Sequence, residues 1–88
     1  LHPAFPNPFN QSTTIRYEIP KETFVRIVIY NLNGEVVSKI AESSHQPGYY
    51  EARWNGMNQR GNVVSSGIYF VRMATESYLH TQKILLMK

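Results

Sequence analysis

With 88 residues, the chain is long enough for one small domain and too short for two. It contains no cysteine, which excludes disulfides, thiolate metal sites and cysteine nucleophiles. The net charge of +3 is modest and no block of like charges appears, so neither a nucleic acid nor a membrane surface is indicated as a partner. No apolar run approaches the length of a membrane span, and we expect no membrane insertion. Because the first residue is Leu1 and not Met, we expect the chain to be a piece of a longer protein.

The chain opens with a proline-rich segment. Three prolines among residues 1–8 are incompatible with a helix interior or a central strand, so we predict an extended linker that leads into the domain. Phe5 and Phe9 are too apolar for a free linker. We therefore expect at least one of them to dock on the domain, which we place at residues 9–88.

The first half of the chain then contains strand patterns. Residues 14–19 alternate strictly, with Ile15, Tyr17 and Ile19 on one face, which is typical of a half-buried strand. Residues 24–32 are apolar on both faces, which predicts a central strand. Asn33-Gly34 follows it and predicts a hairpin turn, because both residues tolerate positive φ. Residues 35–40 complete this hairpin, although the spacing of Val36, Val37 and Ile40 also fits one helical turn.

The second half repeats the pattern of short strands and turns. Residues 41–48 are polar and end in Pro47-Gly48, so we predict a turn there. Residues 49–54 alternate again, residues 55–62 form a loop rich in Asn and Gly, and residues 67–74 and 78–88 complete the set of strands. Six or seven short strands with regular turns predict an all-β fold, an immunoglobulin-like antiparallel β-sandwich of about seven strands.

Catalytic chemistry has little support in the sequence. A hydrolase needs a nucleophile beside a base, or two facing carboxylates. His2, His45 and His80 are isolated, and we expect them to be exposed polar residues. The six glutamates are scattered singly. We predict that the chain is not an enzyme and has no catalytic residue and no cofactor.

The loop at residues 55–62 raises the alternative of a calcium site, because short polar loops with glycine often hold Ca²⁺. This loop offers amide side chains and no carboxylate, and amides alone bind divalent ions poorly. We favour turns held by asparagine side-chain hydrogen bonds, and we predict no metal site.

The aromatic residues suggest a sugar-stacking platform as a second alternative. Trp54 and Tyr50 share one face of their strand, where a small sandwich needs large buried side chains, so we predict that Trp54 lies in the core. Tyr49 points the other way and is the candidate exposed aromatic for a ligand. The arginines at positions 16, 26, 53 and 72 alternate with apolar residues. We interpret them as a solvated sheet face paired with Glu18 or Glu51, and not as an oligonucleotide-binding surface.

Four motifs together resemble a known family. They are "PNPFNQSTTIRYEIP" at residues 6–20, "VRIVIYNLNGEVV" at 25–37, "PGYYEARWNGMNQRGNVVSSGIYFVRM" at 47–73 and "QKILLMK" at 82–88. In this order and spacing they resemble the type A C-terminal sorting domain of the type IX (Por) secretion system, and the related Ig-like domain of flagellar hook-capping proteins. Two departures from the family pattern are Gln11 in place of Pro, and Asn55 and Asn58 in place of Asp.

The resemblance implies a non-catalytic export signal. In this family the domain directs an attached cargo protein across the outer membrane of Bacteroidetes-type bacteria, and the mature protein is secreted or held at the cell surface. The implied partners are the type IX translocon, a sortase-like protease and an N-terminal cargo domain. The translocon recognition segment that the resemblance implies is Lys83, Ile84, Leu85, Leu86, Met87 and Lys88.

Two other functions stay open at this stage. One is an accessory module of a secreted enzyme that binds carbohydrate or packs on the catalytic domain. The other is a structural domain of a flagellar cap-like assembly, which would require self-association. We expect a monomer.

Overall fold

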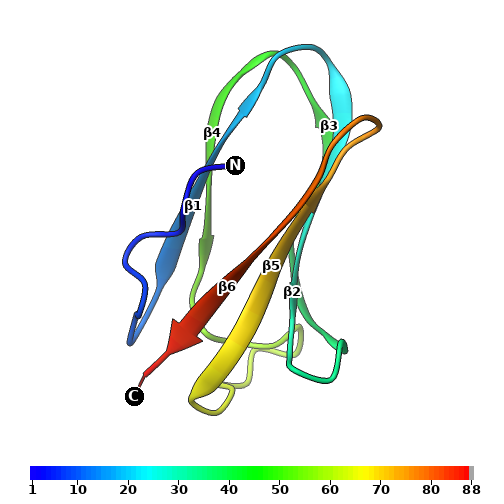
Figure 1. Ribbon diagram of the computed structural model, residues 1–88. Helices are drawn as coiled ribbons and strands as arrows, with labels where there is room; N and C mark the ends of the chain where they lie inside the picture. Colours follow the sequence, from blue (N-terminus) through cyan, green and yellow to red (C-terminus); the bar gives the residue numbers. More distant parts are fainter. Residues whose placement is uncertain (88) are drawn as a thin grey trace.

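A computed structural model describes residues 1–87 of the chain. In this part of the chain, six strands form two sheets that pack face to face (Figure 1). One sheet has the order β1-β4 and the other the order β3-β2-β5-β6, and all neighbouring strands within them are antiparallel. The strands are β1 (Thr13–Ile19), β2 (Thr23–Tyr30), β3 (Val36–His45), β4 (Gly48–Trp54), β5 (Gly67–Ala74) and β6 (Leu79–Leu86). The predicted immunoglobulin-like sandwich is confirmed, with six strands instead of about seven.

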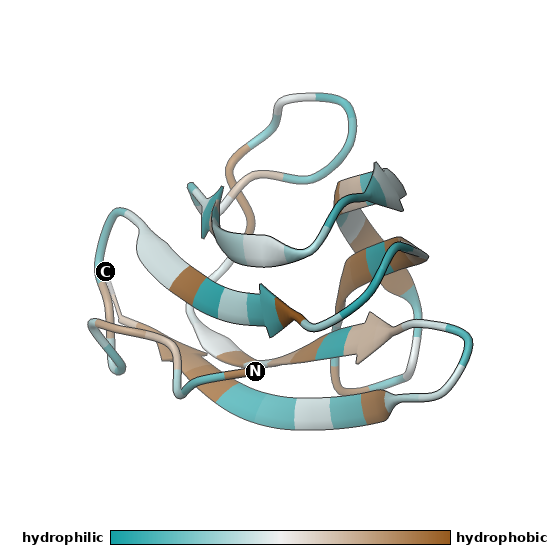
Figure 2. Cartoon of the chain, turned by 90° about the horizontal axis from the view of Figure 1, so that it is seen from above, coloured by the Kyte–Doolittle hydropathy of each residue, from teal (hydrophilic) through white to brown (hydrophobic). Residues whose placement is uncertain are grey.

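The core forms where the apolar faces of the two sheets meet. Alternation along each strand sends every second side chain inward, and Figure 2 shows the resulting hydrophobic and hydrophilic bands along the strands. Each large apolar side chain buried in this way contributes about 1.5–3 kcal/mol. The most deeply buried side chains are those of Ile15, Val25, Ile27, Ile29, Trp54, Val71, Met73, Ile84 and Leu86.

The central position of β2 was predicted correctly, but the polar turn predicted over residues 41–48 was placed too early in the chain. β2 lies between β3 and β5, which confirms the central strand. Residues 41–45, predicted as part of a polar turn, are instead the second half of β3, and Ser44 pairs with Phe24. The sequence is polar here because β3 is an edge strand with one face in water, so backbone pairing to β2 extends the strand without an apolar pattern. Two shifts in register, between Ile27 and Val28 and between Ile29 and Tyr30, accommodate the longer β3.

The predicted hairpin turn at Asn33-Gly34 joins β2 to β3. Only Gly34 has a positive φ, at 80°. The Gly34 amide donates to the Asn31 carbonyl at 3.0 Å, and Asn31 Oδ1 accepts from the amides of Asn33 and Glu35 at 2.9 and 3.0 Å. The Asn31 side chain thus holds the turn, and a single left-handed residue closes it. The predicted hairpin turn is confirmed, and of its two central residues only Gly34 adopts the positive φ that both tolerate.

The N-terminal segment lies against the sandwich and bridges its two sheets along one side (Figure 1). Phe5 first pairs antiparallel with Thr14 of β1, and Phe9 then pairs parallel with Leu86 of β6. Phe9 is only 3% exposed whereas Phe5 is 70% exposed. The prediction that at least one of these rings docks on the domain is therefore confirmed, for Phe9.

Candidate functional site

The C-terminal strand β6 carries most of the recognition segment that the family resemblance implies. Ile84 and Leu86 point into the core and are almost fully buried. Lys83 and Met87 point outward and are exposed, and Leu85 between them is half-buried. The segment therefore has two sets of side chains. The inward ones stabilise the fold, and the outward ones are accessible to a partner. Lys88 lies outside the described residues.

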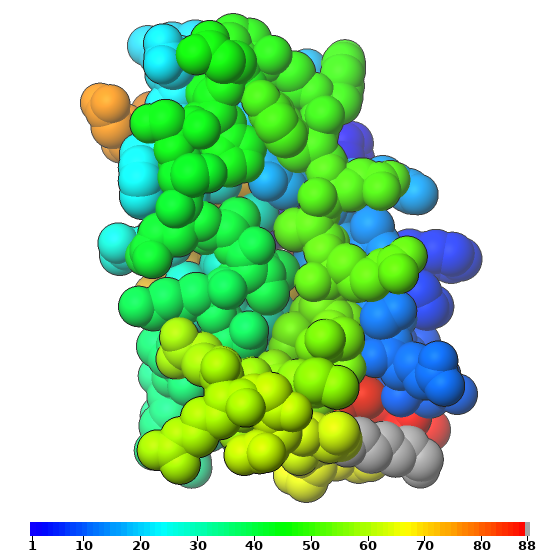
Figure 3. Space-filling view, turned by 180° about the vertical axis from the view of Figure 1, so that it is seen from behind, coloured from blue at the N-terminus to red at the C-terminus, as the bar shows by residue number. Residues whose placement is uncertain are grey.

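Residues 7–9, which we call the clasp, cover the outer edge of β6. The Asn7 side chain bonds twice, with Nδ2 donating to the Lys83 carbonyl at 3.1 Å and Oδ1 accepting from the Leu85 amide at 3.0 Å. The Phe9 amide donates to the Leu85 carbonyl at 3.0 Å, and the Phe9 carbonyl accepts from the Met87 amide at 2.8 Å. Seen from behind, atoms from the two ends of the chain lie side by side (Figure 3). The clasp thus satisfies four backbone groups that face away from β5 between Lys83 and Met87.

Phe9 anchors the clasp in the core. Its ring lies edge-on to the ring of Trp54, with centroids 5.6 Å apart. Trp54 in turn lies edge-on to Tyr69, with centroids 5.1 Å apart, and its indole N–H donates to the Met57 carbonyl at 2.9 Å. Trp54 is 1% exposed, which confirms that it belongs to the core. Edge-to-face pairs of this kind add about 0.5–1.5 kcal/mol to the effect of burial.

Further polar contacts hold the chain on both sides of the clasp. Thr13 is fully buried, and its hydroxyl donates to the Pro6 carbonyl at 2.8 Å. The Gln82 side chain of β6 accepts from the Ala4 amide at 2.7 Å and donates to the His2 carbonyl at 2.9 Å. The two Gln82 contacts join the N-terminal segment to β6 before the clasp begins.

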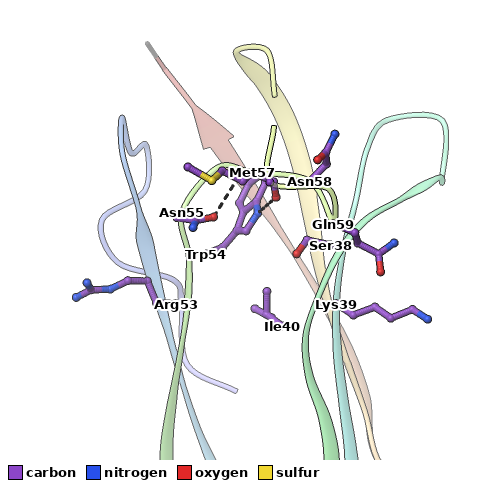
Figure 4. A pocket seen from close by; sticks show the side chains of 10 residues that line it. Ser38, Lys39, Ile40, Arg53, Trp54, Asn55, Met57, Asn58 and Gln59 are labelled. Carbon is purple, nitrogen blue, oxygen red and sulfur yellow. Dashed lines mark hydrogen bonds between the residues drawn. The ribbon is translucent and has the colours of Figure 1, made fainter. Parts of the chain in front are cut away.

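The asparagine-rich loop after β4 borders a shallow hollow of about 420 Å³ at Trp54 (Figure 4). Asn55 Oδ1 accepts from the Met57 amide at 3.2 Å, and Asn58 Oδ1 accepts from the amides of Arg60 and Asn62 at 2.9 and 3.0 Å. The predicted asparagine-held turns are confirmed. Because the loop uses these side-chain oxygens for its own backbone, it presents few ligand atoms for a cation.

His45 differs from the expectation of an exposed polar residue. It ends β3 and lies half-buried beside two tyrosines, with Tyr17 Oη and His45 Nε2 hydrogen-bonded at 2.9 Å. The centroid of its ring is 4.6 Å from that of Tyr50, and Tyr50 stacks on Tyr17 at 5.5 Å. Burial raises the pKa of the Tyr17 hydroxyl above its ordinary value of 10.0, and the charge of ionised Tyr50 adds to this rise. The sequence missed this cluster because the end of β3 was assigned to a turn.

The remaining candidate residues lie apart from one another. His2 and His80 are exposed, as predicted. Tyr49 is 81% exposed on the outer face of β4, opposite Glu18 of β1, and its role in ligand binding stays a prediction. Within residues 1–87, no group of three or more histidine, acidic or cysteine side chains is placed to hold a metal ion.

Two arginines make the predicted kind of contact on the solvated faces. Arg16 pairs with Glu51 across β1 and β4 at 2.9 Å, which confirms the predicted use of Glu51. Arg26 pairs with Glu42 across β2 and β3, also at 2.9 Å. Both pairs are exposed, so each contributes about 0.2–1 kcal/mol.

Residues 1–87 include no helix that is long and apolar enough to cross a membrane.

The two packed sheets and the closed edge of β6 define a small Ig-like β-sandwich domain. The chain belongs to the family of the FlgD Ig-like domain, whose sequence profile matches residues 9–78. The resemblance predicted from the sequence motifs is confirmed at the level of family and fold.

Two solved structures contain a similar fold. Dimeric latent PorU from Porphyromonas gingivalis superposes with a TM-score of 0.74 at 20% identity, over 96% of this chain and 9% of that chain. PorZ, described as an essential bacterial surface component of the type-IX secretion system of Porphyromonas gingivalis, superposes with a TM-score of 0.69 at 18% identity, over 97% of this chain and 11% of that chain. The chain thus spans about a tenth of the length of each protein. No curated protein matches it in sequence.

Proposed function

We propose that the chain is a non-catalytic C-terminal sorting domain that directs the export of an attached cargo protein across the outer membrane through the type IX secretion system. In this proposal, residues 1–8 link the cargo to the domain and residues 9–88 form the sorting domain. The translocon reads the C-terminal strand, and a sortase-like protease processes the exported protein. The product is secreted or held at the cell surface after passage through the periplasm.

The arrangement of β6 is the observation that carries this proposal. The strand lies at the edge of its sheet, with Met87 54% exposed and Lys83 in water, while Ile84 and Leu86 fix it to the core. A receptor can contact the outward side chains without unfolding the domain. The same strand contacts the N-terminal segment, so the recognition segment lies beside the part of the chain that meets the cargo.

The comparisons support the same function from a different direction. Both similar structures are of proteins named with the Por prefix, and PorZ is described as a type IX secretion component. At 18–20% identity the likeness covers the fold, so the sorting role of this chain rests on its motifs and on β6. The non-catalytic role fits the separation of His2, His45 and His80, which lie on different elements.

Point variants test the role of the outward face better than a deletion does. Removing residues 82–88 also removes Ile84 and Leu86 from the core, so loss of export after that deletion has two explanations. Met87→Asp changes only an exposed side chain just after β6, and Leu79→Asp, at the start of β6 and 66% exposed, is its matched control. Each variant is fused to a periplasmic reporter in a host with a type IX system, and the exported fraction is measured.

We expect Met87→Asp to lower the exported fraction about ten-fold, which corresponds to about 1.4 kcal/mol of lost binding, and Leu79→Asp to leave it unchanged. Near-ultraviolet circular dichroism of the purified domains checks that both variants stay folded. Equal export by the two variants would count against recognition through the outward face of β6.

The accessory-module alternative rests on Tyr49. An exposed aromatic ring can stack on a sugar, and Tyr49 is the most exposed of the large hydrophobic side chains in residues 1–87. Its neighbour Tyr50 faces the other way and stacks on Tyr17, so a two-ring platform is not formed there. Titration with a glycan panel tests this function: shifts of the Tyr49 ring resonances that are lost in Tyr49→Ala would support it, and their absence would exclude it.

A further inference from the structure

We propose that the outer edge of β6, from Lys83 to Met87, is a strand-docking surface that the clasp keeps closed in the free domain. An extended segment of the export machinery replaces the clasp when the domain is recognised. This inference rests on the proposed sorting function and specifies how the partner reaches the C-terminal strand.

Between Lys83 and Met87, four backbone groups at the outer edge of β6 are hydrogen-bonded to the clasp. β6 is the last strand of its sheet and pairs with β5 on its other side. The Lys83 carbonyl, the Leu85 amide and carbonyl and the Met87 amide all bond to the clasp at 2.8–3.1 Å. An edge strand with free groups of this kind is a template for the addition of another strand. The clasp therefore closes the site at which a partner strand would bind by backbone pairing.

Two of the four hydrogen bonds between the clasp and β6 are made by the Asn7 side chain. The side-chain amide of Asn7 presents one acceptor and one donor to β6. The backbone of a paired strand residue presents the same two groups, its carbonyl and its N–H. A full strand can replace the Asn7 side chain with its own carbonyl and N–H and leave no group of β6 without a partner. It can also extend the pairing along β6, whereas the clasp contributes only one residue, Phe9, through its backbone.

The clasp can open while the rest of the N-terminal segment stays in place. Phe5 and Thr14 exchange backbone hydrogen bonds of 3.0 and 2.9 Å and close the base of a loop over residues 6–13. The Thr13 hydroxyl also holds the Pro6 carbonyl inside this base. The clasp forms the tip of the loop, so it can leave β6 without separation of residues 2–5 from β1. Opening at this point exposes the recess beside Trp54 that Phe9 fills.

The clasp also indicates which chemistry the incoming segment needs. Phe9 pairs parallel to Leu86 and places an aromatic ring beside Trp54. The incoming segment is thus expected to be extended, to run parallel to β6 and to carry a large apolar or aromatic side chain at the position of Phe9. Without such a side chain, opening of the clasp would leave an apolar recess in water.

The test uses the whole chain and two asparagine variants. Asn7→Ala removes both side-chain bonds to β6, whereas Asn10→Ala makes the same chemical change on an exposed asparagine whose side chain has no hydrogen bond within residues 1–87. The first measurement is amide hydrogen exchange at Leu85 and Met87, which face the clasp, with the amide of Ile84, which faces β5, as the internal reference. The second is the affinity of a fluorescent peptide with the sequence of residues 5–12, FPNPFNQS, for each protein.

Loss of the two Asn7 bonds is expected to speed exchange at Leu85 and Met87 about ten-fold and to tighten peptide binding by a similar factor relative to Asn10→Ala. Exchange at Ile84 is expected to stay slow. Asn7→Asp is a second variant that keeps an acceptor for the Leu85 amide but faces the Lys83 carbonyl with a charge, and it is expected to behave like Asn7→Ala. Unchanged exchange and unchanged peptide affinity in both variants would overturn the proposal.

These outcomes are separable from those of the export experiment. If Met87→Asp stops export and Asn7→Ala neither opens the edge nor binds the peptide, the sorting function stands and the docking surface is wrong. If the edge opens and binds the peptide while export does not depend on β6, the docking surface stands and its partner is not the export machinery. Faster exchange at Ile84 as well would show that the whole strand is released, which contradicts a local clasp.

Discussion

Phe9 and Trp54 meet edge-on, with ring centroids 5.6 Å apart and ring planes at 62° to each other. Phe9 comes from a proline-rich segment and Trp54 from the end of β4, yet the two rings share one part of the core. This contact fixes the clasp to the sandwich and brings the beginning of the chain to its C-terminal strand. The stability of the domain and the accessibility of β6 are therefore coupled through one aromatic ring.

Truncation of this ring is expected to destabilise the domain strongly. Phe9→Ala removes a side chain that is 3% exposed, and replacements of buried phenylalanines by alanine cost about 3–5 kcal/mol. Phe5→Ala, in the same segment but at a ring that is 70% exposed, is the matched control and is expected to change stability by less than about 0.5 kcal/mol. Urea unfolding followed by Trp54 fluorescence gives both values. Similar losses in the two variants would show that Phe9 is not an anchor.

The loop after β4 offers a second prediction. Asn58→Ala removes the acceptor for the amides of Arg60 and Asn62, and the expected loss of stability is about 1–2 kcal/mol. Asn62→Ala is the matched control, because it keeps the hydrogen bond from the Asn58 amide to the backbone carbonyl of residue 62. It is expected to change the free energy of unfolding very little. Denaturant unfolding of the two variants measures the difference. A neutral Asn58→Ala would mean that water replaces its side chain without cost.

The Tyr17 hydroxyl makes stability depend on alkaline pH. The pKa of Tyr17 is raised in the folded state by burial, so the folded protein holds this proton more tightly than the unfolded chain does. The contribution is fully present below pH 10.0 and is lost as the pH rises from there through the raised folded pKa. We expect the free-energy difference between the parent protein and Tyr17→Phe to shrink above this pH.

Tyr49→Phe is the matched control for this titration, because Tyr49 is 81% exposed. It is expected to leave the alkaline loss of stability as it is in the parent protein. Measurements of unfolding by denaturant between about pH 8 and pH 11 bracket the ordinary tyrosine value. If the parent protein and Tyr17→Phe lost stability in parallel over this range, the Tyr17 hydroxyl would not be the group responsible.

The strands of the sandwich were largely predictable because their residues alternate. Ile15, Tyr17 and Ile19 mark the inner face of β1, and the structure buries all of them. The second half of β3 was missed because an edge strand exposed to water needs no apolar pattern, and His45 was placed in a turn for the same reason. Local sequence shows which face of a strand is buried, but it does not show how far backbone pairing extends a strand.

The candidate site was predictable only in part. The resemblance to the sorting family indicated β6, and the apolar character of Phe9 indicated a docked ring. The contact between them was not visible in the sequence, because Asn7 and Lys83 lie at opposite ends of the chain and their bond depends on the three-dimensional arrangement. The Asn7 side chain makes the two hydrogen bonds that a strand backbone would make. No sequence pattern distinguishes this asparagine from the other polar residues of the segment.

The most direct test of the sorting function is a reporter that carries a periplasmic signal peptide, a fluorescent protein and these 88 residues at its C-terminus. It is expressed in a host with a type IX system, beside the same reporter without the domain. We expect the full fusion to reach the cell surface or the medium and the shorter one to stay in the periplasm. Retention of a folded full fusion in the periplasm, with the host's own cargo exported normally, would contradict the sorting function.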